Sequence, residues 1–209
     1  MKPSARLLQV IVGAHRRGRL DPLSEAVTQW RVLPSDLDLF GHMNNSRYLA
    51  MMDLARIDLL IRVGLLPDVV RNRWVVPLGG ASFDFKGALK LLERYEIGTR
   101  LVGWDERWFY FQQEFRRVKE PSRPVGVGYV KALFHGPQGS VSPAHVIETG
   151  LGRELPRPDM PDAVRERLGL PRRVSISVPS GTNAYIGRAS MPDARMAASF
   201  PGLTGSLAG

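Results

Sequence analysis

The sequence predicts an α+β domain in which a curved, mainly antiparallel sheet wraps around one long central helix. The first observation is residues 46–64, about five helical turns whose apolar side chains occur nearly all round rather than along one stripe. The second is a series of β-prone segments joined by short turns, one before this helix and four after it. A helix that is apolar on most sides must be buried on most sides, so the strands are expected to enclose it.

The expected strands are rich in β-branched and aromatic residues and end at turn-forming residues. They span residues 25–33, 74–85, 95–104, 108–115 and 125–134. A turn is expected at residues 121–124, which read Pro-Ser-Arg-Pro. The central helix should end at Gly64, a residue type that commonly follows the last helical turn.

The two ends of the chain differ from its centre. Residues 1–24 form a basic extension, expected as a short helix that packs on the domain or makes weak contact with an anionic membrane surface through residues 1–20. Residues 25–137 form the α+β domain. Residues 138–173 contain two prolines placed early in helical turns and predict short helices packed on that domain. Residues 174–209 are dominated by Ser, Gly, Ala, Pro and Arg without a period, which is typical of a flexible or disordered tail.

Composition excludes several classes of protein. The chain has 209 residues, of which 44% are hydrophobic and 23% charged, as in a globular protein that can bury a core. It has no cysteine, so disulfides, thiolate nucleophiles and cysteine-ligated metal sites are excluded. No apolar run reaches the roughly 20 residues of a transmembrane helix. We therefore expect a cytoplasmic protein.

The net charge of +9 belongs mainly to the two ends. Residues 1–20 contain five basic and no acidic residues, and residues 171–209 contain four arginines and one aspartate. Residues 21–170 therefore carry only +1. Because a nucleic-acid-binding domain concentrates positive charge on its folded unit, no nucleic-acid partner is expected.

The most concentrated polar chemistry lies between residues 36 and 45, directly before the central helix. This stretch reads Asp-Leu-Asp-Leu-Phe-Gly-His-Met-Asn-Asn. The N-terminus of a helix offers free backbone N–H groups and the positive end of the helix dipole. A carboxylate in such a loop can attack or activate water beside donors that stabilise a developing oxyanion.

These motifs resemble a known family. Asp36, Asp38 and Gly41 before a long helix resemble the D-x-D-x-x-G motif of hotdog-fold thioesterases of the 4-hydroxybenzoyl-CoA thioesterase type. Together with residues 42–49 and the turn at residues 99–107, they resemble the thioesterase superfamily member six group. The similarity covers roughly residues 28–135. It implies a hotdog fold for residues 25–137, thioester hydrolysis and a homodimer or higher homo-oligomer.

The resemblance assigns Asp38 as the catalytic carboxylate, acting as nucleophile or as general base on water. The backbone amides from Gly41 to Asn45 are expected to receive the oxyanion, and Asp36 is expected to be structural. His42 is expected to orient the loop or to contact the thioester. A Ser-His-Asp scheme is not supported, because the sequence contains no G-x-S-x-G motif.

The two adjacent asparagines, Asn44 and Asn45, are expected to have different roles. Either Asn44 or Asn45 suits the N-cap of the helix, and the other can direct its amide at the carbonyl or the attacking water. Tyr48, one turn into the helix, is a substrate contact or a core residue. The candidate site residues are catalytic Asp38, His42 and Asn45, and substrate-binding Gly41, Met43, Asn44, Tyr48 and Arg107.

The turn at residues 104–107 departs from the 4-hydroxybenzoyl-CoA thioesterase pattern. Where that pattern is rich in basic residues that hold nucleotide phosphates, this chain has Asp105 and Glu106 and retains only Arg107. The substrate is accordingly expected to be an acyl-CoA or an acyl group on a carrier protein, with no separate cofactor. No metal is expected, because the four histidines show no ligand spacing.

Two alternatives remain open at the level of sequence. The first is a hotdog module that binds acyl groups or a protein partner without hydrolysis. The second is a hydratase, whose D-x-N-P-x-H motif is one residue longer than the stretch from Asp38 to His42 and contains Asn and Pro, which are absent here.

Overall fold

A computed structural model describes residues 5–171 of the chain. Its helices and strands, in chain order, are α1 (Ala5–Arg17), β1 (Ala26–Arg31), η1 (Pro34–Asp36), α2 (Asn45–Val63), α3 (Leu66–Arg71), β2 (Leu78–Phe85), β3 (Arg94–Trp104), β4 (Phe109–Arg117), β5 (Glu120–Ala132), β6 (Phe134–Gly136), β7 (Gly139–Val141), α4 (Pro143–Leu151) and α5 (Asp162–Arg167). The tail predicted for residues 174–209 lies outside the described residues.

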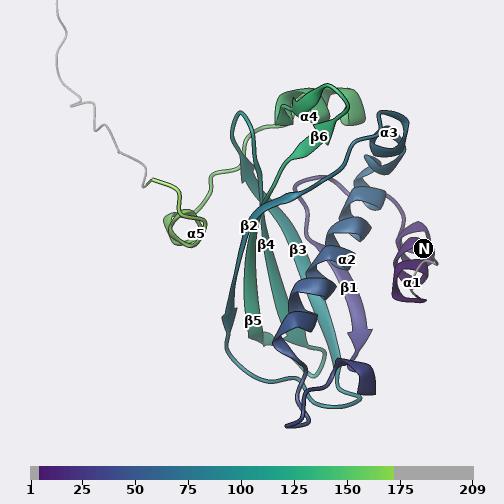
Figure 1. Cartoon of the computed structure of the whole chain (residues 1–209), viewed down its shortest axis with the longest axis vertical. Helices are drawn as coiled ribbons and strands as arrows, with labels where there is room; N and C mark the ends of the chain where they lie inside the picture. The colour runs from purple at the N-terminus through teal and green to yellow at the C-terminus, as the bar shows by residue number, and fades with distance from the viewer. Residues whose placement is uncertain (1–4, 172–209) are drawn as a thin grey trace, which may run out of the picture. The chain divides into compact units, whose positions relative to one another are not determined.

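The five long strands form one antiparallel sheet in the order β1-β3-β4-β5-β2. The helix α2 lies along one face of this curved sheet, and α1 lies beside α2 (Figure 1). The prediction of a mainly antiparallel sheet wrapped around one central helix is therefore confirmed.

The central helix is defined at both ends by its caps. The side chain of Asn44 accepts a hydrogen bond from the Ser46 amide at 2.9 Å, which makes Asn44 the N-cap. Gly64 ends the helix in the left-handed conformation, with φ of 87°. Both boundaries agree with the predicted helix.

Two faces of α2 are buried against different partners. Tyr48, Met52 and neighbouring residues face the sheet and join the main hydrophobic core. Met51 and Asp58 face α1, where they contact arginine side chains. The apolar character all round the helix thus reflects cover by α1 as well as by the sheet.

The expected turn at residues 121–124 is wrong, because these residues belong to β5. The turn lies instead at residues 118–119, where β4 meets β5. Strand β2 pairs with β5 only from Gly126 onward, so the two prolines lie on a stretch without a neighbour on that side. Proline is tolerated there because no ladder hydrogen bond is lost.

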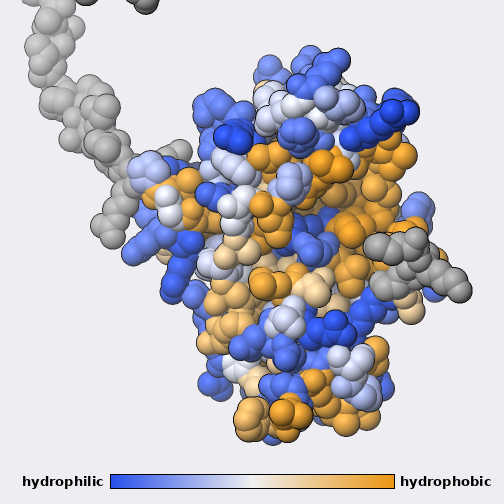
Figure 2. Space-filling view, in the orientation of Figure 1, coloured by the Kyte–Doolittle hydropathy of each residue, from blue (hydrophilic) through white to orange (hydrophobic). Residues whose placement is uncertain are grey.

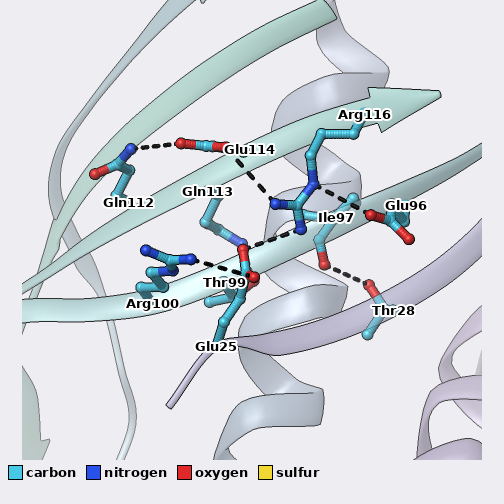
Figure 3. Close-up of polar contacts among 10 residues, drawn as sticks. All are labelled: Glu25, Thr28, Glu96, Ile97, Thr99, Arg100, Gln112, Gln113, Glu114 and Arg116. Atoms are coloured by element: carbon cyan, nitrogen blue, oxygen red, sulfur yellow. Dashed lines mark hydrogen bonds and ion pairs between the residues drawn. The ribbon is translucent and has the colours of Figure 1, made fainter. Parts of the chain in front are cut away.

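The two faces of β3 and β4 carry different polar groups, as alternation along a strand requires. On the outer face, Arg116 pairs with Glu25 at 3.0 Å and with Glu96 at 3.2 Å (Figure 3). On the inner face, Arg56 of α2 donates to the buried Gln113 at 2.6 Å, and Gln113 donates to Thr99 at 3.0 Å. The inner contacts fix the rotation of α2 on the sheet.

The short helices after the sheet are present as expected. Ser142 caps α4 by accepting a hydrogen bond from the His145 amide at 3.3 Å. Residues Met160 and Val164, beside and within α5, pack on Tyr110 at the outer face of the sheet. Among residues 5–171, no helix has the length and apolar character needed to cross a membrane.

Candidate active site

The segment between η1 and α2 forms a closed loop, called here the Asp38 loop (residues 36–44). Its base is tied by the Asn44 amide, which donates to the Asp36 carbonyl at 2.8 Å. Above this base, the Asp38 amide donates to the His42 carbonyl at 2.8 Å. The Met43 amide donates to the Leu89 carbonyl at 2.8 Å, so the neighbouring loop before β3 supports one side.

The carboxylate of Asp38 is held by backbone amides of its own loop. Its Oδ1 accepts hydrogen bonds from the amides of Phe40 at 2.9 Å and His42 at 3.2 Å. Gly41 has φ of 75°, the conformation that lets the chain fold back over Asp38. Within residues 5–171, Oδ2 of Asp38 has no hydrogen bond, and the residue is partly exposed. One oxygen therefore orients the carboxylate, while the other has no hydrogen-bond partner in the described chain.

The backbone amides expected to receive an oxyanion are mostly used within the chain. Those of Gly41, His42, Met43 and Asn44 all donate to groups of the loop or of its neighbour. Among these described amides, only that of Asn45 has no acceptor in the chain. Asn45 is the exposed first residue of α2, at the positive end of the helix dipole. Of the five amides predicted to receive the oxyanion, the Asn45 amide is thus the one left free to donate to a bound group within the described chain.

The second aspartate of the loop, Asp36, is fully buried at 0% exposure. Its Oδ2 accepts a hydrogen bond from the Leu33 amide at 2.9 Å and another from the guanidinium of Arg6. The Nε of Arg47 lies 3.3 Å from Oδ1, which has no hydrogen bond within the described chain. Asp36 is therefore a structural anchor of the loop, as expected.

A buried tyrosine lies close to this anchor. Burial raises the pKa of the Tyr95 hydroxyl above its ordinary value, and the charges of Arg6, Asp36 and Arg47 also act on it. This hydroxyl has no hydrogen-bond partner among residues 5–171. Arg6, Arg47 and Tyr95 are not among the site residues that the sequence predicts, because their proximity to Asp36 arises only in the folded chain.

Two predicted substrate contacts lie in the core. Tyr48 is buried, and its ring centroid lies 5.1 Å from that of Phe83 and 5.0 Å from that of Phe115. Burial also raises the pKa of Tyr48. Met43 is buried in the same core. The structure therefore places both side chains behind the loop, where they support its shape.

The structure separates Arg107 from the Asp38 loop within one chain. The loop lies at the end of the sheet where β3 begins, whereas Arg107 lies in the turn where β3 ends, 11 residues along the strand. The guanidinium of Arg107 is 5.2 Å from the ring centroid of Trp108. The remaining predicted residues, Gly41, His42, Asn44 and Asn45, lie together in or beside the loop.

The acidic turn beside Arg107 has a structural explanation. Asp105 accepts hydrogen bonds from the Arg107 amide at 2.8 Å, the Trp108 amide at 2.7 Å and the Tyr110 hydroxyl at 2.5 Å. Burial alone would raise the pKa of Asp105, but these hydrogen bonds hold it below its ordinary value. Asp105 therefore shapes the turn, which gives this acidic residue a structural role.

Apolar side chains gather at the same end of the molecule as the Asp38 loop (Figure 2). Leu39 is fully exposed and Phe40 is 85% exposed at the loop tip. Leu91 and Leu92 are exposed on the neighbouring loop. Within residues 5–171, no group of three histidine or acidic side chains could hold a metal ion.

The sheet order, the enclosed helix and the aspartate loop at the start of that helix together define a hotdog-fold protein of the thioesterase class. Residues 32–168 match the Thioesterase-like superfamily, and the chain belongs to that family. It is 34% identical over 146 residues to Protein THEM6 of Xenopus laevis, covering 69% of this chain and 67% of that protein. Protein THEM6 of Danio rerio is 32% identical over 142 residues, covering 67% of each chain. The predicted family resemblance is confirmed.

Solved structures share the fold at lower sequence identity. A gentisyl-coenzyme A thioesterase superposes with a TM-score of 0.53 and 19% identity, covering 58% of this chain and 98% of that one. A hypothetical protein of Thermus thermophilus superposes with a TM-score of 0.55 and 22% identity, covering 62% of this chain and 100% of that one. These similarities establish the hotdog architecture.

Proposed function

We propose that this protein hydrolyses the thioester of an acyl-CoA or of an acyl group on a carrier protein, with Asp38 as its catalytic carboxylate. The observation that carries this proposal is the geometry of Asp38. Two amides fix Oδ1, while Oδ2 is left without a hydrogen bond in the described chain. An oriented, partly exposed carboxylate at a helix N-terminus suits attack on a carbonyl or activation of water.

The reaction can proceed through Asp38 in two ways. As a nucleophile, the carboxylate attacks the thioester carbonyl and expels the thiolate, and water then cleaves the resulting mixed anhydride. As a general base, the carboxylate takes a proton from the water that attacks the carbonyl. In both cases the Asn45 amide and side chain are the proposed oxyanion donors, with His42 orienting the loop.

The proposed substrate class is supported by the names of proteins that share the fold. The gentisyl-coenzyme A thioesterase is named for a CoA thioester, and a protein of Staphylococcus aureus with the same fold is described in complex with CoA. Each shares the fold with this chain at low identity, 19% and 9%. They support CoA as one candidate carrier, and protein-bound pantetheine is the other.

The proposal is tested by incubating the protein with acyl-CoAs of short, long and aromatic acyl groups and measuring the released thiol. Asp38→Asn is expected to lower kcat by roughly 10²–10⁴-fold, because it removes the base or nucleophile. Asp21→Asn is the matched control, since Asp21 also accepts an amide hydrogen bond from a residue two positions on, at 2.9 Å. Absence of thiol release by the wild type across the panel would contradict hydrolysis.

Isotope labelling tests the nucleophilic role of Asp38. A single turnover in ¹⁸O-water transfers label to the Asp38 side chain if water opens an anhydride at the aspartyl carbon. The general-base route, like opening of the anhydride at the acyl carbon, places all of the label in the released acid, so label in Asp38 is the result that identifies the nucleophile. Mass spectrometry of the peptide that contains Asp38 measures the difference.

A second candidate function is an acyl-binding module without hydrolysis. It is favoured by the fact that the hydrogen bonds of Asp38 also account for this residue as a turn-stabilising side chain. Thermal stabilisation by acyl-CoA without any release of thiol would support this alternative.

A homodimer is proposed as the assembly. The exposed Leu39 and Phe40 at the tip of the Asp38 loop form an apolar surface that a second copy can cover. Sedimentation analysis is expected to give twice the mass of one chain. Phe40→Ser should shift the equilibrium toward the single chain, and a wild type that remains single at high concentration would contradict the assembly.

A further inference from the structure

The arginine that anchors the Asp38 loop comes from outside the matched family region. The family match begins at residue 32, whereas Arg6 lies in the first turn of α1. A cation is unfavourable in the first turn of a helix, because the helix dipole places positive partial charge there. The position of Arg6 is therefore explained by its partners in the folded protein rather than by helix formation.

Arg6 is the arginine that is hydrogen-bonded to Asp36. Its guanidinium donates to Oδ2 of Asp36 and also contacts the sulfur of Met51 on α2 at 2.9 Å. Arg47 approaches only Oδ1, without hydrogen-bond geometry. The Arg6 side chain is 18% exposed and that of Arg47 is 41% exposed, so Arg6 is the better shielded partner. Charge pairing is stronger where water is excluded.

Asp36 in turn sets the base of the Asp38 loop. Its side chain holds the Leu33 amide on one side, and its carbonyl accepts from the Asn44 amide on the other. Asp38 is two residues further along the chain. A buried carboxylate without a cation carries a large desolvation cost, which displacement of this segment toward water would relieve.

We propose that Arg6 is a positioning residue for Asp38, acting by neutralising the buried Asp36 and so fixing the base of the Asp38 loop. In this arrangement α1 belongs to the active site although it lies outside the matched family region. The inference rests on the proposed catalytic role of Asp38, and its structural part can be measured without catalysis.

The other end of α1 supplies a matched control. Arg17 donates to Oδ1 of the fully buried Asp58 at 2.5 Å, so it makes the same kind of contact as Arg6. Asp58 lies in the C-terminal part of α2, away from the Asp38 loop. Loss of either arginine should loosen α1, but only loss of Arg6 should disturb the loop.

The test compares Arg6→Gln and Arg17→Gln by thioester hydrolysis and by hydrogen exchange of residues 37–44. For Arg6→Gln we expect kcat to fall by about 10–100-fold with little change in KM, because misplacement of a catalytic group lowers the rate of the chemical step. Exchange in the loop should become faster. For Arg17→Gln, thermal stability should fall while kcat and loop exchange stay close to wild type. Arg6→Lys, which keeps the charge, should recover part of the loss.

Three outcomes would overturn the inference. The first is equal kcat for the two glutamine variants, and the second is unchanged loop exchange in Arg6→Gln. The third is equal loss in Arg6→Lys and Arg6→Gln, which would exclude neutralisation of Asp36. If Arg6→Gln does not fold, kcat and loop exchange are compared between Arg6→Lys and Arg17→Lys instead. Equal values in these two variants would then overturn the inference. If the wild type hydrolyses no thioester, the proposed function fails, and loop exchange alone decides whether Arg6 orders the loop.

Discussion

The two ends of α2 use the same electrostatic arrangement for different purposes. At each end a fully buried aspartate is hydrogen-bonded to an arginine of α1 and approached by an arginine of α2. Asp36 has Arg6 and Arg47, and its second oxygen lies 3.3 Å from Arg47. Asp58 has Arg17 and Arg62, and its second oxygen lies 3.8 Å from Arg62. In both aspartates this second oxygen has no hydrogen bond within the described residues.

The two aspartates differ in the part of the structure that each one supports. Asp58 belongs to regular helix and joins α2 to α1. Asp36 belongs to η1 and supports a loop whose tip is exposed and whose carboxylate Asp38 is held by only two amides. A buried aspartate beside regular helix thus serves stability, whereas we propose that the same arrangement beneath a loop also controls the placement of Asp38.

The largest expected effect comes from removing either buried aspartate. Asp58→Ala and Asp36→Ala should each lower the free energy of unfolding by about 3 kcal/mol, because each removes the charged acceptor of an arginine hydrogen bond and empties the space of a fully buried side chain. The kcat of folded Asp58→Ala should remain close to that of the wild type, and that of Asp36→Ala should fall. Urea denaturation and thiol release measure the two quantities. Equal kcat in the two variants would contradict the claim that Asp36, but not Asp58, controls the Asp38 loop.

A smaller effect is expected at Tyr48, which supports the N-terminal end of α2 from the core. Tyr48→Leu should lower the free energy of unfolding by about 2 kcal/mol, because the ring packs against Phe83, Phe85 and Phe115. Tyr48→Phe retains the ring, so kcat and KM should stay near those of the wild type. A large rise of KM in Tyr48→Phe would instead show that the hydroxyl binds substrate.

The two glycines on either side of α2, Gly41 and Gly64, provide a further comparison. Gly41 has φ of 75° and Gly64 has φ of 87°, so alanine at either position should cost about 1–2 kcal/mol. At Gly64 a Cβ would also meet the Arg19 side chain, which must move, whereas at Gly41 it would point into open space. Gly64→Ala is thus expected to be the less stable variant and Gly41→Ala the less active one. Thermal denaturation and the thioester assay test this order.

Local patterns were sufficient to predict the central helix and its caps. Apolar residues nearly all round the helix, two asparagines before it and Gly64 after it are all short-range signals, and the structure confirms the boundaries. The presence of a loop before the helix could also be predicted, since Asp, Gly and Asn are residues that commonly form turns. The strand limits were less accurate at residues 120–124, because the ends of the neighbouring strand decide whether proline is tolerated there.

Long-range pairing could not be predicted from these patterns. Arg6 and Asp36 are 30 residues apart, and Arg6 is one of five basic residues in a segment that reads as a charged surface. The direction of a side chain cannot be predicted from these patterns either, since Met43 lies within the loop and Tyr48 shortly after it, but both are buried in the core. Which loop amides have acceptors within the chain also depends on a second loop. That loop supplies the Leu89 carbonyl, which accepts from the Met43 amide.

The smallest predicted effect concerns Asp105, whose hydrogen-bond donors are two backbone amides and a tyrosine rather than arginines. The pKa of Asp105 is held below its ordinary value, so its ionised form favours the folded state above about pH 4, and this contribution is lost as the pH falls through the lowered folded-state pKa. Tyr110→Phe removes one of the three donors. The loss of stability in Tyr110→Phe should therefore be larger at pH 6 than at pH 3, as measured by urea denaturation at both values. A loss that does not change with pH would show that the Tyr110 hydroxyl stabilises the turn independently of the charge on Asp105, in contrast to the charge-based anchors formed by Asp36 and Asp58.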